Sequence, residues 1–219
     1  MPEDSRQGGR YRLYGRPGTG SAASEAALAE AGADFDIADV AKEPDATARF
    51  ALVNPRGQVP ALVHPDGTVI TEGAAILLHI ADAFPAERLA PPPGTAARAS
   101  HDRWLLYFHA NVYEGELRRY YPDRYTADPA CSEAVETAAR DYVQRHYALF
   151  ENQLEGGDYC LRSGFSMLDI YLWMLVQWMD RYWMEKHCPC IVKVTDRVSR
   201  RGHVSPVHDR HFGPAAVTA

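Results

Sequence analysis

One stretch of the 219-residue chain combines a proline before a strand with an acidic residue and a glycine before a helix. Residues 54–63 run Asn-Pro-Arg-Gly-Gln-Val-Pro-Ala-Leu-Val, and residues 71–76 run Thr-Glu-Gly-Ala-Ala-Ile. This order predicts a tight loop, a strand entered at Pro60, a hairpin, and a helix opened by Glu72 and Gly73. A proline that enters a strand leaves the backbone of the preceding residue available, and a helix start offers free N–H groups.

These features together suit a small zwitterionic peptide as the ligand. Its backbone would pair with Val59, its carboxylate would bind at the helix start, and its ammonium would face Glu72. The plain alternative is a helix start beside a turn proline, with no ligand. The residues alone leave both interpretations open.

Charge and hydropathy narrow the class of protein. The formal net charge is −6, so no basic field favours nucleic acid or an anionic membrane. No apolar run approaches the ~20 residues that span a bilayer, and residues 1–10 are polar with no signal-peptide core. We therefore expect a cytoplasmic protein with neither a nucleic acid nor a membrane as its partner.

The four cysteines suggest free thiols rather than a disulfide framework. Cys188 and Cys190 flank a proline and follow His187, which invites a metal-site interpretation. Zinc ligands usually come as two Cys-x2-4-Cys-type pairs, and no second pair exists here. We expect a plain loop leading into a helix, and no metal.

The first part of the chain has the pattern of a compact α/β unit. Short alternating or apolar runs predict strands, and an Ala- and Leu-rich run that stops at a glycine predicts a helix. The expected strands are residues 11–14, 35–40, 61–64 and 68–70, and the expected helices are residues 21–31 and 72–83. This βαβ…ββα order is that of a thioredoxin-like fold, with a right-handed crossover between the first two strands.

A proline-rich linker separates this unit from a second one. Residues 85–95 include three consecutive prolines, which make a stiff, extended spacer. Everything after the linker has helical character, with expected helices at residues 96–120, 129–154, 166–185 and 189–200. We therefore place an α/β domain at 11–84, an all-α domain at 96–207, and flexible tails at 1–10 and 208–219.

A local signal marks the start of the third of these helices. Ser166 and Asp169 form a variant of the capping box, and Phe165 is placed to pack on Ile170 as a hydrophobic staple. Because the residues that follow are strongly apolar, we interpret Asp169 as a capping residue and not a catalytic one.

The stretch 54–76 closely resembles the glutathione-binding half of glutathione transferases, and the capping box resembles the one that opens the core helix of their C-terminal domain. The resemblance extends from about Tyr11 to Val207. It implies a thioredoxin-like domain followed by an all-helical domain, a cis peptide before Pro60, glutathione as co-substrate and a homodimer. The glutathione-binding residues it implies are Gly20, Gln58, Val59, Pro60, Glu72 and Gly73.

The loop between the first strand and the first helix is where a thiol would be activated. A thiolate beside a helix N-terminus is stabilised by the helix dipole and by hydroxyl and N–H donors, so no general base is needed. The loop is similar to that of bacterial beta-type members, but Gly20 stands where they carry cysteine. Our candidates for contact with the thiolate are Ser21, then Thr19, then Tyr14. Alternatively, Ser21 only caps the helix and Tyr14 only packs in its strand.

By the same resemblance, a second substrate binds between the domains. Tyr107 and Asn111 share a helical face, and Tyr120 follows, so these three are the candidates for an electrophile pocket. Packing between domains or subunits is the competing interpretation. His109 is expected to be a packed or surface histidine.

The leading functional hypothesis is a glutathione transferase that activates the thiol for attack on a hydrophobic electrophile. Conjugation, thioether cleavage, dehalogenation and isomerisation all start from the same thiolate, and the sequence does not choose among these or peroxidase chemistry. One alternative is a non-catalytic interaction or stress module, and another is a relative of this fold recruited to a biosynthetic pathway.

Overall fold

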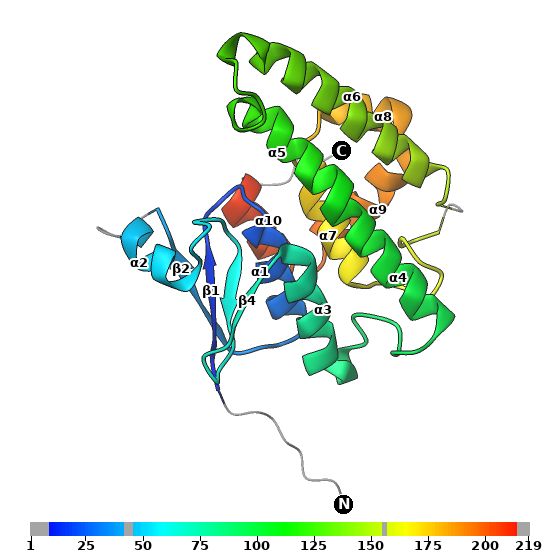
Figure 1. Ribbon diagram of the computed structural model, residues 1–219. Helices are drawn as coiled ribbons and strands as arrows, with labels where there is room; N and C mark the ends of the chain where they lie inside the picture. The colour runs from blue at the N-terminus through cyan, green and yellow to red at the C-terminus, as the bar shows by residue number, and fades with distance from the viewer. Residues whose placement is uncertain (1–8, 42–45, 155–156, 214–219) are drawn as a thin grey trace, which may run out of the picture. The chain divides into compact units, whose positions relative to one another are not determined.

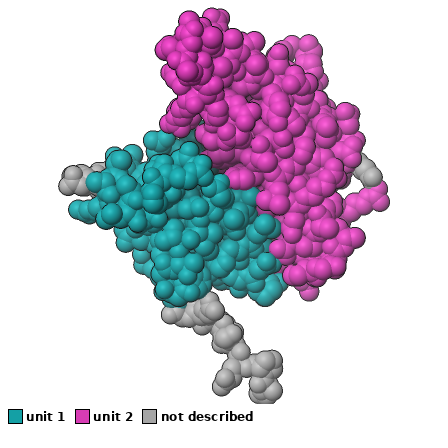
Figure 2. Space-filling model, in the orientation of Figure 1, with its two compact units in different colours: residues 1–87, 201–219 teal, residues 88–200 magenta. Residues whose placement is uncertain are grey.

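The structure is a computed structural model that describes residues 9–41, 46–154 and 157–213. It divides into two compact units, which Figure 2 colours separately. The first unit comprises residues 1–87 and 201–219, and the second comprises residues 88–200. The first unit is thus discontinuous in sequence, since its last segment follows the whole of the second unit.

The first unit has the strand and helix order of a thioredoxin-like domain, as the sequence predicted. Its sheet has the order β2-β1-β3-β4, in which β1 and β2 are parallel and the other pairs are antiparallel. Its elements are β1 (Tyr11–Gly15), α1 (Ser21–Glu30), β2 (Phe35–Asp39), α2 (Ala46–Val53), β3 (Ala61–Val63), β4 (Val69–Thr71), α3 (Gly73–Ala83), η1 (Pro85–Glu87) and α10 (Ser205–Phe212). Helix α2 was not predicted.

Helices cover both faces of this sheet. Helices α1 and α3 pack together on one face and α2 lies on the other (Figure 1). Leu13 of β1 and Leu62 of β3 are fully buried, and α3 contributes Ile76, Leu77 and Ile80 to the same core. The apolar residues of α3 recur with helical spacing, so one stripe of the helix faces the sheet.

The C-terminal segment packs against α1. Arg201 forms a two-pronged ion pair with Glu30 near the end of α1, with both N–O distances at 2.8 Å. Helix α10 continues to Phe212, so residues that we expected to begin a flexible tail at His208 are helical here. Arg10, in the other expected tail, pairs with Asp34. Residues 1–8 and 214–219 lie outside the described part.

The second unit is helical throughout its regular elements. These are α4 (Ala96–Tyr107), η2 (Phe108–Tyr113), α5 (Glu114–Tyr120), η3 (Pro122–Arg124), η4 (Pro129–Cys131), α6 (Ser132–Glu151), α7 (Met167–Val176), α8 (Arg181–His187) and α9 (Pro189–Ser199). The helix expected at 96–120 is one continuous run that contains a π-helical segment, η2. None of the described helices is long and apolar enough to cross a membrane.

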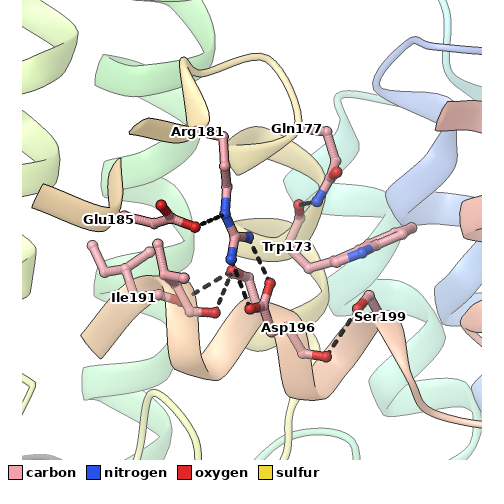
Figure 3. A network of polar contacts seen from close by, with 9 residues as sticks. Trp173, Gln177, Arg181, Glu185, Ile191, Asp196 and Ser199 are labelled. Atoms are coloured by element: carbon pink, nitrogen blue, oxygen red, sulfur yellow. Dashed lines mark hydrogen bonds and ion pairs between the residues drawn. The ribbon is translucent and has the colours of Figure 1, made fainter. Parts of the chain in front are cut away.

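The prediction of a single helix at 166–185 was wrong, because two helices lie there. Helix α7 ends at Val176, and α8 begins at Arg181 after an N-cap in which the Asp180 carboxylate accepts from the Trp183 N–H at 2.7 Å. No glycine or proline marks this break in the sequence. Figure 3 shows how Arg181, at the start of α8, reaches Asp196 of α9 with two hydrogen bonds.

Helix α7 forms the centre of the second unit, because every one of its residues is buried. An all-round apolar helix is stable only when neighbours cover all its sides, and α4 and α9 pack on it. The carboxylate of Asp169 accepts hydrogen bonds from Ser166 N at 2.8 Å and Ser166 Oγ at 2.9 Å. Asp169 therefore has the capping role that the sequence predicted.

Candidate functional site

Three chain segments meet at one edge of the sheet in the first unit. Tyr14 of β1 pairs with Ala61 of β3, and Ala61 pairs with Thr71 of β4. The β1–α1 loop begins after Gly15, the residue that follows Tyr14. Pro60 directly precedes Ala61, and Glu72 directly follows Thr71. The sheet register thus brings the loop, the proline turn and the start of α3 to one place.

The β1–α1 loop is closed by Ser21, the first residue of α1. Its side chain is 1% exposed. The Oγ of Ser21 donates to Arg16 O at 3.1 Å or shares a hydrogen bond with Thr19 Oγ1 at 2.9 Å, and it accepts from Arg16 N at 3.2 Å. Ser21 can lie this close to β1 only because residue 15 is a glycine. A Cβ on residue 15 would lie 2.5 Å from Ser21 Cβ, which is too close for two carbon atoms.

The other candidates of this loop differ in their surroundings. Thr19 is half-buried, and its hydroxyl donates to Arg16 O at 2.8 Å. Gly20 is the N-cap of α1, so it lies at the positive end of the helix dipole. Tyr14 stacks on Phe50 of α2 with ring centroids 5.4 Å apart, which places it in the packing of α2.

The turn before β3 is organised by Asn54, which the sequence analysis did not single out. Its side-chain N–H donates to Gln58 O at 2.7 Å, and its backbone carbonyl accepts from Gly57 N at 2.8 Å. The Val59–Pro60 peptide is cis, in agreement with what the resemblance implied. Asn54 thereby holds Gln58 and the cis turn beside the sheet edge.

Glu72 has a backbone conformation that non-glycine residues rarely adopt, with φ at 64° and ψ at 111°. Such conformations cost about 1–3 kcal/mol and concentrate at ligand sites. The carboxylate of Glu72 is half-exposed and pairs with Arg56 at 2.8 Å. The sequence assigns no role to Arg56, because only the fold brings it next to Glu72.

Gly73 and Ala74 open helix α3 directly after Glu72, and both are buried. The first N–H groups of a helix have no partner within the helix. A carboxylate and free N–H groups therefore lie next to each other at the start of α3. This arrangement can bind an amino acid end group that carries an ammonium and a carboxylate.

In the second unit, two of the three electrophile-pocket candidates face α6. The Tyr107 hydroxyl is hydrogen-bonded to His146 Nδ1. The side chain of Asn111 donates to Tyr107 O at 2.9 Å and accepts from the Tyr142 hydroxyl at 2.7 Å. Tyr107 and Asn111 do share a face, as their spacing predicted, and their polar groups join α4 and η2 to α6.

Tyr120 has different partners and is 52% exposed. Its hydroxyl donates to Trp178 O at 2.9 Å. Trp178 in turn contacts Tyr113, with ring centroids 5.4 Å apart, and Tyr113 stacks on Tyr171 at 6.4 Å. These four residues, which we call the aromatic cluster, bring Tyr120 together with side chains that the sequence analysis did not select.

The pair Cys188 and Cys190 lies at the start of α9. Burial, and secondarily Glu151, raises the pKa of Cys188 to about 12, and a side-chain hydrogen bond to Glu151 is the main cause of the raised pKa of Cys190. The Glu151 carboxylate also caps α9 by accepting from Cys190 N at 2.8 Å. Burial therefore favours the protonated thiol of Cys188, and the Glu151 carboxylate disfavours the thiolate of Cys190. No group of three or more potential metal ligands lies within the described ranges.

Two family models match this chain. The model described as glutathione S-transferase, N-terminal domain, matches residues 9–82, and the model described as glutathione S-transferase, C-terminal domain, matches residues 132–210. The chain belongs to the glutathione S-transferase family.

Individual relatives of this glutathione S-transferase family member span most of its length. It is 30% identical to the uncharacterised GST-like protein YncG of Escherichia coli K12, over 91% of this chain and 98% of that protein. It is 29% identical to glutathione S-transferase GstA of Escherichia coli O157:H7, over 76% of this chain and 81% of that protein. A sphingomonad glutathione S-transferase solved in complex with glutathione is 32% identical, with a TM-score of 0.76, 90% of this chain and 96% of that chain being covered.

Proposed function

We propose that this protein is a glutathione transferase that binds glutathione at the described sheet edge and activates its thiol at the N-terminus of α1. One observation carries the proposal. The Arg16–Ser21 loop, the cis Val59–Pro60 turn and Glu72 all adjoin the same set of paired strand residues, so they lie at the same end of the sheet. The glutathione complex of the 32% identical sphingomonad enzyme supports it.

Each part of glutathione has a chemically matched partner in this arrangement. The γ-glutamyl ammonium pairs with Glu72, and the α-carboxylate accepts from the free N–H groups at Gly73 and Ala74. The cysteinyl backbone pairs with the backbone of Val59 beside the cis peptide. Arg56 shares Glu72 with the incoming ammonium and so holds the carboxylate in place.

The thiol then lies at the start of α1. The helix dipole and the N–H groups at Gly20 and Ser21 favour the thiolate over the thiol and lower the thiol pKa. We propose Thr19 as the hydroxyl that donates to sulfur, since it is the more exposed of the two hydroxyls. Ser21, our first candidate from the sequence, is proposed to anchor the loop instead, because its Oγ is buried among Arg16 and Thr19.

The electrophile is proposed to be hydrophobic and to pack on the aromatic cluster. Tyr120 is the most exposed of the three candidate residues, and Tyr113 and Trp178 are each partly exposed. Aromatic faces of this kind suit an apolar molecule with few polar groups.

The homodimer implied by the family resemblance is also a proposal, which size-exclusion chromatography with light scattering tests.

A second candidate function is a non-catalytic module that binds glutathione without turnover. The burial of Ser21 and the engagement of the Thr19 hydroxyl with Arg16 O favour it. The two functions differ in turnover with an electrophile and not in affinity for glutathione.

Calorimetric titration with glutathione tests the site itself. We expect micromolar to millimolar affinity for the wild type and at least a tenfold loss for Glu72→Gln, because the variant loses the charge that pairs with the ammonium. Glu133→Gln, at an exposed position of α6, serves as the matched control and should bind as the wild type does. Equal affinity in Glu72→Gln and the control would refute the assignment of Glu72.

A further inference from the structure

The chain after residue 200 neutralises both acids of α1. Helix α1 contains two acidic residues, Glu25 and Glu30, and no lysine or arginine. The side chain of Glu25 is 2% exposed and that of Glu30 is 5% exposed. Arg210 pairs with Glu25, and Arg201 pairs with Glu30. A buried carboxylate without a partner is strongly unfavourable, so each acid needs its arginine.

The two acids differ in their distance from the proposed thiol site. Ser21 and Glu25 are four residues apart, so they share a face of α1 with about 6 Å between their Cβ atoms. Glu30 follows Ser21 by nine residues, which is about 14 Å along the helix axis. Glu25 is therefore the acid whose charge acts on a thiolate at the start of α1.

The end of α10 lies beside the β1–α1 loop as well as beside α1 (Figure 1). A Cβ added to Gly18 would lie 3.8 Å from the backbone oxygen of His211, which is an ordinary contact distance. The helix that carries Arg210 is thus fixed next to the loop and to the first two turns of α1.

Arg210 supplies the positive charge in this contact, and His211 does not. Burial, and secondarily Arg210, lowers the pKa of His211 to about 4, so the imidazole is uncharged at neutral pH. Its Nε2–H donates to the Glu25 carboxylate at 2.9 Å. Arg210 stays charged at every pH of interest. Among the described residues, it is the permanent cation that pairs with Glu25.

An unpaired carboxylate at Glu25 would act against the dipole of α1. The N-terminus of a helix favours a thiolate through a partial positive charge equivalent to about half an elementary charge. A full negative charge one turn away in a buried position would offset this effect and disfavour the thiolate. The pairing with Arg210 cancels most of that negative field.

We propose that Arg210 acts on the reaction through Glu25: it cancels the charge of this buried carboxylate and so keeps the thiolate of bound glutathione favoured at the start of α1. This role of Arg210 rests on the proposed binding of glutathione at that site. Arg210 needs no contact with glutathione or with the electrophile, so it is a positioning residue and not a catalytic one.

The pKa of the bound glutathione thiol tests the proposal, measured by the ultraviolet absorbance of the thiolate with excess protein. Arg210→Gln should raise this pKa by about one unit, because the charge of Glu25 is left uncancelled one helical turn away. Arg210→Lys keeps the positive charge and should retain the wild-type value. Arg201→Gln is the matched control: it leaves Glu30 unpaired at the far end of α1 and should shift the thiol pKa much less.

Variants of Glu25 separate an electrostatic role from a structural one. Glu25→Gln should lower the thiol pKa, because Arg210 then acts without its counter-charge. In the double variant Glu25→Gln/Arg210→Gln neither charge remains, so the thiol pKa should return toward the wild-type value although the ion pair is lost. A merely structural role would instead make the double variant depart further from the wild type. Circular dichroism establishes that each variant is folded.

Three results would each overturn the proposal: an unchanged thiol pKa in Arg210→Gln, an equal shift in Arg201→Gln, or a double variant further from the wild type than Arg210→Gln. Calorimetry with glutathione keeps the two proposals distinct. Glutathione binding with a thiol pKa that Arg210→Gln does not move refutes the role of Arg210 alone. No binding by the wild type refutes the glutathione site, and the role of Arg210 with it.

Discussion

The carboxylate of Glu25 in α1 lies 2.9 Å from His211 Nε2 in α10, although 186 positions separate them in the sequence. Arg210 pairs with the other oxygen of the same carboxylate. Glu25 is 2% exposed, and it lies one helical turn after Ser21 on α1. The helix proposed to activate the thiol is therefore held by the last described helix of the chain.

This contact predicts a large effect of Glu25 on stability. Glu25→Ala should lower the free energy of unfolding by about 3 kcal/mol, because it leaves Arg210 and His211 without their buried partner. Urea denaturation measures the change. Glu133→Ala, on the exposed face of α6, should change stability by less than about 0.5 kcal/mol. Similar small losses in both variants would mean that α10 does not stabilise α1.

Glu116 predicts a pH dependence of stability. Burial raises its pKa to about 7, and Arg119 only partly offsets the shift. The pKa of Glu116 is therefore higher in the folded than in the unfolded protein. The contribution of its protonated form to stability is full below about pH 4.5 and is lost as the pH rises through about 7. The loss amounts to up to about 3 kcal/mol in the free energy of unfolding. Glu116→Gln should remove this loss. Urea midpoints of both proteins between pH 5 and pH 8, roughly the range around this pKa, measure it; parallel curves would contradict the assignment.

Gly15 predicts a steric test of the thiol loop. In Gly15→Ala the new Cβ would meet Ser21 Cβ at 2.5 Å and Ser21 Oγ at 2.6 Å, so the loop must move. We expect a loss of about 1–3 kcal/mol in stability and weaker glutathione binding. Gly202→Ala meets no atom within 4 Å and should behave as the wild type. Wild-type binding by Gly15→Ala would show that the loop does not need its present geometry.

The two hydroxyls of the loop predict different kinetic effects. With chlorodinitrobenzene as a chromogenic electrophile, Thr19→Val should lower kcat/KM roughly ten- to a hundredfold, because the thiolate loses a donor. Thr19→Ser should retain most of the activity. Ser21→Ala should lower stability more than it alters the pH profile of kcat/KM. The reverse pattern would return the donor role to Ser21.

Local chemistry explains what the sequence could predict. The proline turn at 54–60, the glycine stop after α1 and the capping box at Ser166 each involve residues a few positions apart, so their patterns carry the structure. The break between α7 and α8 escaped prediction because Asp180 caps the second helix where no glycine or proline stops the first.

Tertiary contacts account for the remaining differences between the predicted and the observed structure. The pairs Glu25–His211 and Arg56–Glu72 join distant parts of the chain, and no spacing rule connects them. Tyr107 and Asn111 face α6 because the Tyr142 hydroxyl donates to Asn111 and His146 is hydrogen-bonded to the Tyr107 hydroxyl. Both partners belong to α6, so the sequence of α4 alone does not reveal them.

The pKa of the glutathione thiol in its complex with this protein tests the central claim most directly. It is measured by titrating the ultraviolet absorbance of the thiolate in the presence of excess protein. A thiol is half-ionised near pH ~8.5 in water, and a helix N-terminus brings that midpoint down to roughly 3.5–7.5. We predict a midpoint below about 7 for the wild type and a higher one for Thr19→Val. A bound thiol that titrates as it does in free glutathione would contradict activation at α1.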